Sequence, residues 1–306
     1  MQKKNITILA SLGILFVTVI WGFAFVVVKN SLDAVPPLYM MAFRFSIAAL
    51  MLSLVFCRRF ASLTKAAVIH GTGIGIALFL AYAFQTIGCK YTTAGKNAFL
   101  TTFYVILVPF INWALVKNKP DFYSLFAAVL SITGIGLLSL RGDLTMNIGD
   151  VLTLICGFCY ALQIVFIARY SQNDDPVMLA VLQIIVSAVL SWIAALLFEG
   201  PFPVTAVKDT GVIGSMLYLG LLSTMVAFLL QNVCQKYTPP STASILMSFE
   251  AVFGMLFSVI FLREPLSLRG FAGCLLMFVA VIVSETKLSF LRPRKAAKPE
   301  ADADKY

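Results

Sequence analysis

The chain has 306 residues, of which 60% are hydrophobic and only 12% charged. A soluble domain carries about 45–50% apolar and about 25% charged residues, so this composition excludes an ordinary soluble protein and indicates an integral membrane protein. The formal net charge of +9 does not indicate nucleic-acid binding, because the basic residues fall in short segments between apolar runs and in the tail. Such a distribution is typical of topology signals and of contacts with phospholipids.

The first apolar run, residues 7–28, follows a basic head. It is longer than the roughly 7–15-residue core of a signal peptide, so we expect a retained first span. Nine more apolar runs follow with short connections and without two-residue alternation, which favours helices over a barrel. We therefore predict an all-α integral membrane protein with ten transmembrane helices. The predicted spans are 7–28, 38–57, 68–88, 94–116, 122–140, 150–168, 177–198, 211–235, 241–262 and 270–286.

Lysine and arginine predict the orientation of these spans. More of them lie in the segments on the same side as the N-terminus, for example Arg58, Arg59 and Lys65, than on the opposite side. The positive-inside rule then predicts a multi-pass protein of the cell membrane, inner or cytoplasmic, with both termini in the cytoplasm. Residues 288–306 are charged and poor in apolar side chains, and we expect a disordered cytoplasmic tail there.

The chain contains an internal repeat. "QTIGCKYT" begins at Gln85 and "QNVCQKYT" at Gln231, and these two segments end the third and eighth predicted spans. A displacement of five spans reverses direction across the membrane, so the copies predict an inverted-topology repeat. "WGFAF" in the first span likewise corresponds to "CGFCY" in the sixth. We predict two five-helix repeats, residues 1–144 and 145–287.

These segments resemble the drug/metabolite transporter (DMT) superfamily, EamA type, over residues 6–286. The resemblance implies a ten-helix secondary transporter with a central cavity between its halves and with the fifth and tenth spans at the periphery. It is specific for the family and weak for the substrate. The segments that carry it are "WGFAF", "FRFSIAALML", "GKNAFLTTFYVILVPF" and "SFEAVFGMLFSVIFLREPLSLRGFAG".

Glu250 is the strongest single candidate for function. It lies near the middle of the ninth span, where a carboxylate is costly unless it is paired, hydrated or protonated. It is interpreted as a proton-coupling group or a partner for a substrate amine, with a buried hydrogen-bonding strut as the alternative. Through the repeat, its helical face corresponds to that of Asn97, Thr101 and Tyr104, which we expect at the cavity. Alternatively, Asn97 only caps the start of its span.

Other candidates are polar or aromatic side chains at equivalent places in the two halves. Aromatic rings beside amides form suitable walls for flat or alkyl substrates. Alternatively, the rings only pack against neighbouring helices, and the amides only tie helix ends to their loops. Arg44 is interpreted as a contact for a carboxylate or phosphate, or as a gating residue, or as a brace at a helix end. The remaining candidates are Trp21, Phe25, Tyr82, Gln85, Tyr160, Gln163 and Gln231.

The predicted function is secondary transport of a small organic metabolite (an amino acid, an amine or a drug-like amphipath) by alternating access, with export implied by the resemblance. A proton is the expected coupling ion, the bilayer is the surrounding partner, and a monomer or homodimer is expected. No cofactor, metal site or enzymatic activity is predicted. "TTAGKN" lacks a complete P-loop pattern, no cluster of His, Asp and Glu has the spacing of metal ligands, and no loop could contain a soluble catalytic domain. The alternatives are an uncoupled facilitator, an importer and, remotely, a membrane enzyme acting on lipid head groups.

Overall fold

The computed structural model describes residues 2–116, 122–139, 146–204, 208–238 and 240–286, and every regular element in these ranges is a helix. The prediction of an all-α protein is therefore confirmed. The predicted tail at 288–306 lies outside the described residues. The elements are α1 (Gln2–Ser31), α2 (Pro37–Val55), the 3₁₀ segment η1 (Cys57–Ser62), α3 (Lys65–Tyr91), α4 (Ala94–Thr101), α5 (Tyr104–Val116), α6 (Phe122–Ser139), α7 (Ile148–Tyr170), α8 (Pro176–Phe198), α9 (Thr210–Leu217), the π-helical η3 (Tyr218–Val226), α10 (Ala227–Gln235), α11 (Pro240–Phe257), the π-helical η4 (Ser258–Leu262) and α12 (Leu268–Thr286).

Each predicted span coincides with one of these helices or with consecutive helical segments. In the described part of the chain, 7 helices are long and apolar enough to cross a membrane, and the apolar stretches Leu246–Leu262 and Leu268–Ala280 are shorter. The predicted span 94–116 differs from the structure, because it is divided between α4 and α5 at Thr102 and Phe103. The predicted span 211–235 contains the π-helical segment η3 in its middle.

Local sequence signals determine where several helices begin. An unpaired backbone N–H in the first turn is satisfied when a short polar side chain precedes the helix. Thr64, Asn147, Asp175 and Asp209 supply such caps for α3, α7, α8 and α9, each accepting a hydrogen bond from a backbone N–H within the next three residues.

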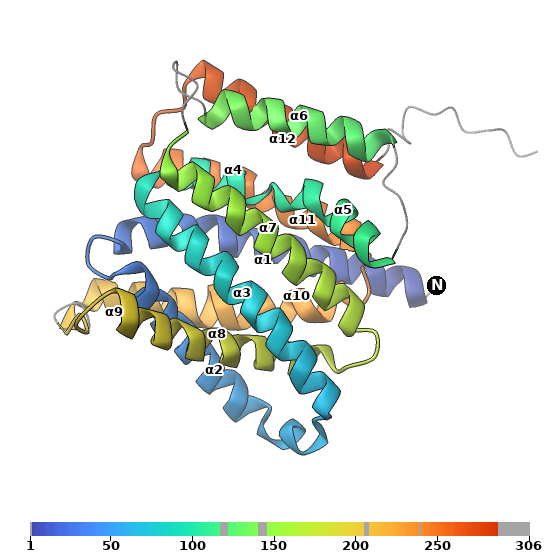
Figure 1. The fold of residues 1–306 in the computed structure, drawn as a ribbon, viewed down its shortest axis with the longest axis vertical. Helices are drawn as coiled ribbons and strands as arrows, with labels where there is room; N and C mark the ends of the chain where they lie inside the picture. Colours follow the sequence, from blue (N-terminus) through green and yellow to red (C-terminus); the bar gives the residue numbers. More distant parts are fainter. Residues whose placement is uncertain (1, 117–121, 140–145, 205–207, 239, 287–306) are drawn as a thin grey trace, which may run out of the picture.

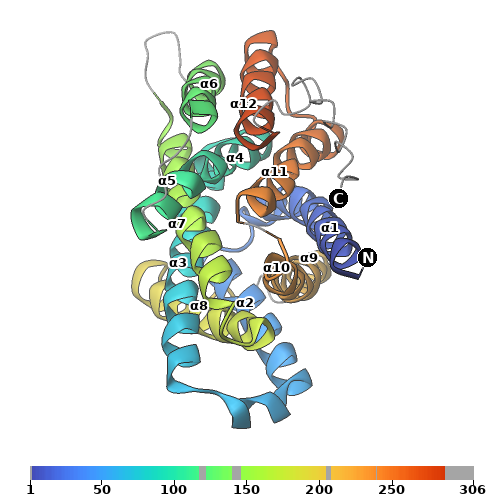
Figure 2. The same cartoon turned by 90° about the vertical axis from the view of Figure 1, so that its right-hand side faces the viewer.

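The helices form a layered bundle. In both views α6 and α12 lie side by side at one end of its long axis, and α2 and α8 lie at the other end (Figures 1 and 2). Between these two pairs, α3 packs against α7 on one side, while α1 packs against α10 and α11 on the other (Figure 2). The polar side chains described below point into the space between these two sides.

Glycine allows α1, α4 and α11 to approach one another closely. A Cβ added at Gly254 would lie 2.5 Å from Cβ of Ala98, and one added at Gly22 would overlap Phe253. Small residues at helix crossings are typical of membrane proteins, because they let the helix backbones approach closely and pack by van der Waals contact. These crossings place the middle of α11 beside α1 and α4.

Candidate functional site

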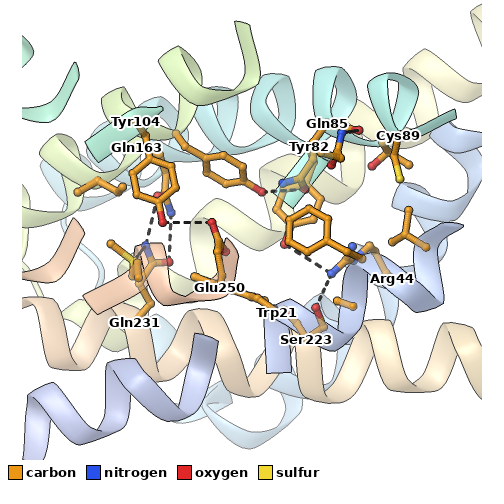
Figure 3. A pocket seen from close by; sticks show the side chains of 18 residues that line it. Trp21, Arg44, Tyr82, Gln85, Cys89, Tyr104, Gln163, Ser223, Gln231 and Glu250 are labelled. Atoms are coloured by element: carbon orange, nitrogen blue, oxygen red, sulfur yellow. Dashed lines mark hydrogen bonds between the residues drawn. The ribbon is translucent and has the colours of Figure 1, made fainter. Parts of the chain in front are cut away.

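A cavity with about 550 Å³ of empty space, including its opening, lies in the middle of the bundle. Its walls combine aromatic rings, amides, aliphatic side chains and two residues of opposite charge (Figure 3). Ligand sites in membrane bundles are commonly of this kind, with a few polar groups in an otherwise apolar wall. The lining residues are Trp21, Ala24, Phe25, Val28, Arg44, Tyr82, Gln85, Thr86, Cys89, Asn97, Tyr104, Tyr160, Gln163, Ile164, Ser223, Gln231, Met247 and Glu250.

All the residues predicted from the sequence to form a site line this cavity, except Thr101. Thr101 is fully buried one step behind the wall, where its hydroxyl accepts a hydrogen bond of 3.1 Å from Nε2 of Gln85 and donates one of 2.8 Å to the carbonyl of Asn97. It therefore orients Gln85, which does line the cavity.

Glu250 lies on α11 with only 5% of its surface exposed. Its Oε1 accepts a hydrogen bond of 3.1 Å from the hydroxyl of Tyr104, and it forms no ion pair with any described residue. A single hydroxyl is weak compensation for a buried carboxylate, which ordinarily requires pairing or several donors. The structure thus presents an incompletely compensated acid to the cavity.

The break between α4 and α5 places Tyr104 opposite Glu250. α4 ends at Thr101, the next residue Thr102 donates its hydroxyl to the carbonyl of Phe99 at 2.7 Å, and α5 begins at Tyr104. Interrupted helices near the middle of a membrane are tolerated where the freed backbone is buried in protein or borders a cavity.

Four amides join the helices around the cavity. Gln163 donates to Oε1 of Gln183 at 3.1 Å, and it exchanges longer contacts of 3.4 and 3.5 Å with Gln231. Gln85, which begins the other copy of the repeated segment, accepts a hydrogen bond of 3.3 Å from the hydroxyl of Tyr160. Both repeated glutamines therefore face other helices and do not tie their helix ends to a loop.

Arg44 is 3% exposed, so it does not extend to the membrane surface. Its Nε donates to the hydroxyl of Thr224 at 2.9 Å, and its Nη2 donates to the hydroxyl of Ser223 at 2.9 Å. The guanidinium carbon lies 4.6 Å from the centre of the Tyr82 ring, a cation–π contact. All these partners are neutral, and no described carboxylate lies within ion-pair distance.

The π-helical geometry of η3 presents the two hydroxyl residues to Arg44. Thr224 donates to the carbonyl of Leu219, five residues earlier, at 2.7 Å. The carbonyl of Ser223 accepts a hydrogen bond of 2.9 Å from Nε1 of Trp21 on α1. Short π-helical segments occur frequently at functional sites, because they redirect side chains and release backbone carbonyls.

The tyrosine rings form a continuous wall. Tyr82 and Tyr160 have ring centres 5.7 Å apart, and Tyr160 and Tyr104 have ring centres 6.3 Å apart, all in edge-on arrangements. Tyr82 contacts Arg44, and Tyr104 contacts Glu250. The rings therefore connect the two charged side chains along one side of the cavity.

Sequence reasoning missed several lining residues, among them Ser223, Thr86 and Cys89. A serine or cysteine within an apolar span is common and carries no distinctive signal. Ser223 and Thr224 are consecutive hydroxyl residues in the eighth predicted span, which hints at a polar site there. The sequence does not reveal that Arg44 lies opposite them. Among the described residues, no three His, Cys, Asp or Glu side chains are close enough together to hold a metal ion.

Charged contacts join α1, the end of α3, α4 and α7 beside the cavity. Lys29 donates to the carbonyls of Cys89 and Thr92 at 2.8 and 2.7 Å, at the end of α3. Asp150 on α7 accepts from Thr92 at 2.6 Å and pairs with Lys96 at 2.8 Å. Because Cys89 also lines the cavity, this cluster lies directly beyond one end of it.

Comparison with known proteins identifies the family. The model of the EamA-like transporter family matches residues 8–140 and again residues 147–286. The chain belongs to the EamA-like transporter family. The resemblance to the DMT superfamily is thus confirmed, and the protein is a multi-pass membrane protein of a transporter family.

The relatives of this EamA-family protein have similar length. An uncharacterized transporter of Archaeoglobus fulgidus is 38% identical over 275 residues, covering 90% of this chain and 85% of the relative. A probable amino-acid metabolite efflux pump of Salmonella typhimurium is 25% identical, covering 88% and 92%. A solved structure described as "Crystal structure of protein" has a TM-score of 0.68 and 17% identity, covering 92% of this chain and 98% of that one, which shows the shared fold.

Proposed function

We propose that this protein is a secondary transporter that exports a small organic metabolite across the cytoplasmic membrane by alternating access. The observation that carries the proposal is the central cavity, in which buried Arg44 and Glu250 both face the same space without pairing with each other. A helix bundle that only packs in lipid would avoid such groups. Export is supported by relatives named as probable amino-acid metabolite efflux pumps in Salmonella typhimurium and Escherichia coli, 25% and 24% identical.

The proposed architecture is ten transmembrane helices in two inverted five-helix repeats, residues 1–144 and 145–287. Its support is that the family model matches twice. In addition, α2 packs against α8 and α6 packs against α12, which are the pairs that a two-fold axis in the membrane plane would bring together. Alternating access follows in this architecture from movement of one repeat against the other around the cavity.

Glu250 is the proposed proton-coupling group. Its support is its burial, its single hydroxyl partner and its place at the cavity. A carboxylate that exchanges a proton as the cavity changes its exposure links solute movement to the proton gradient. The hypothesis fails if Glu250→Gln transports at the normal rate and still responds to an imposed pH gradient.

The test of the proposed function compares metabolites released by cells that express the wild type, Glu250→Gln or an empty vector. Compounds enriched only with the wild type would support export and the involvement of Glu250. Equal enrichment by both proteins would support transport and reduce Glu250 to a structural strut. If confirmed expression changes neither release nor uptake of any solute, the proposal is wrong. Accumulation of the solute against its gradient in proteoliposomes excludes an uncoupled facilitator.

A further inference from the structure

The face of α10 that borders the cavity carries further polar residues beyond it. Gln231 lines the cavity, where it exchanges contacts of 3.4 and 3.5 Å with Gln163 (Figure 3). Gln235, the last residue of α10, lies one turn after Gln231 and therefore on the same face, and Thr238 follows in the turn after the helix. This polar face thus extends from the cavity toward the end of the bundle at which α11 begins.

Gln235 and Thr238 are buried without hydrogen-bond partners. Their exposed fractions are 1% and 3%. The amide oxygen and nitrogen of Gln235 and the hydroxyl of Thr238 have no partner among the described residues. A buried polar group costs stability unless it is bound, so such groups are nearly always bound to protein or to ordered water. These atoms therefore require a hydrogen-bonding partner other than the residues that the structure describes.

Two neighbouring amides show the same pattern. Gln163 donates to Oε1 of Gln183 on α8 at 3.1 Å, but no described residue accepts a hydrogen bond from Nε2 of Gln183. Asn232 donates to the carbonyl of Phe228 at 2.8 Å, and its Oδ1 has no described partner either. Of the seven such atoms in the described part of the chain, four lie between Asn232 and Thr238, so they are concentrated at the end of α10.

The other copy of the repeated segment differs at these positions. The repeat pairs Thr92 with Thr238 and Cys89 with Gln235. The hydroxyl of Thr92 donates to Asp150 at 2.6 Å, whereas that of Thr238 has no described partner. The cavity includes Cys89 but does not extend to Gln235. The end of α10 therefore lies between the cavity and the nearer end of the bundle, and its polar groups are available to a bound molecule.

We infer that Gln231, Gln235 and Thr238 line a hydrated passage between the cavity and the end of the bundle at which α11 begins, the proposed cytoplasmic side. The inference rests on the proposed transport function and gives the route by which the solute reaches the cavity. Water satisfies the buried amide and hydroxyl groups, and polar groups of the solute replace that water as it passes. Amides and hydroxyls are neutral and both donate and accept, so they suit a polar solute without holding it tightly.

The first experiment measures how fast a small, membrane-impermeant thiol reagent, trimethylammonium-ethyl methanethiosulfonate, reacts with single cysteines. Gln235→Cys in an otherwise cysteine-free variant is compared with the variant that keeps only the native Cys234. Cys234 is 8% exposed and faces α1, since a Cβ added at Gly13 would lie 2.8 Å from its Sγ. Exposure in the structure alone would make Cys234 the faster of the two. A hydrated passage reverses this order, and Gln235→Cys should react about tenfold or more faster.

Sealed vesicles of both orientations show from which side the reagent enters. Reagent on the side of the N-terminus should label Gln235→Cys, and reagent on the other side should label it about tenfold or more slowly. Thr238→Cys is tested in the same way, so the result does not depend on the folding of one variant.

A second experiment tests the polar groups themselves. Gln235→Leu removes the amide at similar size and should leave the thermal midpoint equal or higher, because it removes an unsatisfied buried group. Transport should fall about fivefold or more, since water and solute lose a hydrogen-bonding partner in the passage. Gln235→Asn keeps an amide and should retain most of the transport rate. Gln172→Leu, the same change at an exposed position outside the cavity, should leave transport unchanged.

The inference is overturned if Gln235→Cys and Thr238→Cys react no faster than Cys234, if they react only from the opposite side, or if Gln235→Leu transports at the wild-type rate. A lower thermal midpoint of Gln235→Leu would also contradict it, because the amide would then be satisfied within the protein. Labelling requires no solute, so it decides the matter even if Gln235→Leu does not fold. The proposed function fails differently, by the absence of any solute movement by the wild type. Solute movement by a protein whose introduced cysteines stay unreactive would overturn the inference and leave the transport function intact.

Discussion

The hydroxyl of Tyr104, the first residue of α5, donates a hydrogen bond of 3.1 Å to Oε1 of Glu250 on α11. The two residues come from the two halves of the sequence, and the proposed repeat pairs their positions. The duplicated position therefore carries an acid in one half and its hydrogen-bond donor in the other. This asymmetry gives the two copies different roles at the same cavity.

Tyr104→Phe should reduce transport about tenfold while the protein still folds. The substitution keeps the ring but removes the hydroxyl, and a lost hydrogen bond to a buried charged group costs about 1.5–3 kcal/mol. The measurement is the efflux rate, per amount of protein, of the solute identified by the release comparison. Glu250→Gln already removes the carboxylate that the Tyr104 hydroxyl binds. Adding Tyr104→Phe to this variant should therefore cause little further loss, and the effects of the two substitutions should not add.

Tyr237→Phe is the matched control, because Tyr237 is 48% exposed and does not line the cavity. It should transport at the wild-type rate. If Tyr104→Phe and Glu250→Gln reduce the efflux rate additively, the contact between Tyr104 and Glu250 does not contribute to transport.

The membrane character, the helices and most of the cavity residues could be predicted from the sequence. Glu250 and Arg44 were detectable because charge inside an apolar span is rare, and the repeat extended the argument to Asn97 and Tyr104. The glutamines Gln85 and Gln231 were detectable because each begins one copy of the repeated segment. These signals are local or periodic in the sequence, so they can be recognised without knowing how the helices pack.

The breaks in the helices could not be predicted. The α4–α5 interruption at Thr102 and Phe103 contains neither glycine nor proline, so the local sequence carries no signal for it. The π-helical register of η3, and with it the approach of Ser223 to Arg44, depends on contacts with α1 and α2 that are distant in sequence. Helical spacing predicted that Thr101 lines the cavity. In the structure its hydroxyl binds Gln85, and Gln85 lines the cavity instead.

Asp150→Asn should loosen the contacts of α7 with α4 and with the end of α3, beside the cavity. The substitution removes the charge that pairs with Lys96 at 2.8 Å and weakens the acceptor for Thr92. Because Lys96 is partly exposed, we expect a loss of about 1 kcal/mol, which changes an open-to-closed ratio about fivefold. The measurement is the rate at which a membrane-impermeant maleimide labels Cys89, the remaining cysteine in an otherwise cysteine-free variant.

The matched control for Asp150→Asn is Asp174→Asn, which removes a carboxylate from a different pair, that with His70 at 2.7 Å. It should leave labelling of Cys89 unchanged. An equal increase in both variants would indicate general destabilisation, and no increase in either would show that the charged cluster does not restrict access to Cys89.

Glu199, at the end of α8, should make stability depend on pH. Its carboxylate accepts hydrogen bonds from the backbone N–H groups of Leu38 and Tyr39 at 2.8 and 2.9 Å, which caps α2. Burial raises the pKa of Glu199 above its ordinary value, although these hydrogen bonds oppose the shift. An acid with a raised pKa in the folded state binds more protons there than in the unfolded state, so its contribution to stability falls as pH rises through the window between the two pKa values.

The measurement for Glu199 is the thermal midpoint of the wild type and of Glu199→Gln between pH 4 and 8. The stability of the wild type relative to this variant should decrease as pH rises through the lower part of this range and then level off. Glutamine does not titrate, so the difference isolates the carboxylate. A difference that increases with pH would mean that the backbone hydrogen bonds outweigh burial.

Gly254→Ala should destabilise the protein, whereas Gly73→Ala should not. A Cβ at position 254 would lie 2.5 Å from Cβ of Ala98 and force α11 away from α4, and overpacking of this kind costs about 1–3 kcal/mol. A Cβ at position 73 would meet nothing within 4 Å, and alanine is favoured over glycine inside a helix by about 1 kcal/mol. Thermal unfolding in detergent should therefore give a lower midpoint for Gly254→Ala and an equal or higher one for Gly73→Ala. Because Glu250 lies one turn before Gly254, solute binding should also weaken only in Gly254→Ala, and equal midpoints for the two variants would contradict the close crossing of these helices.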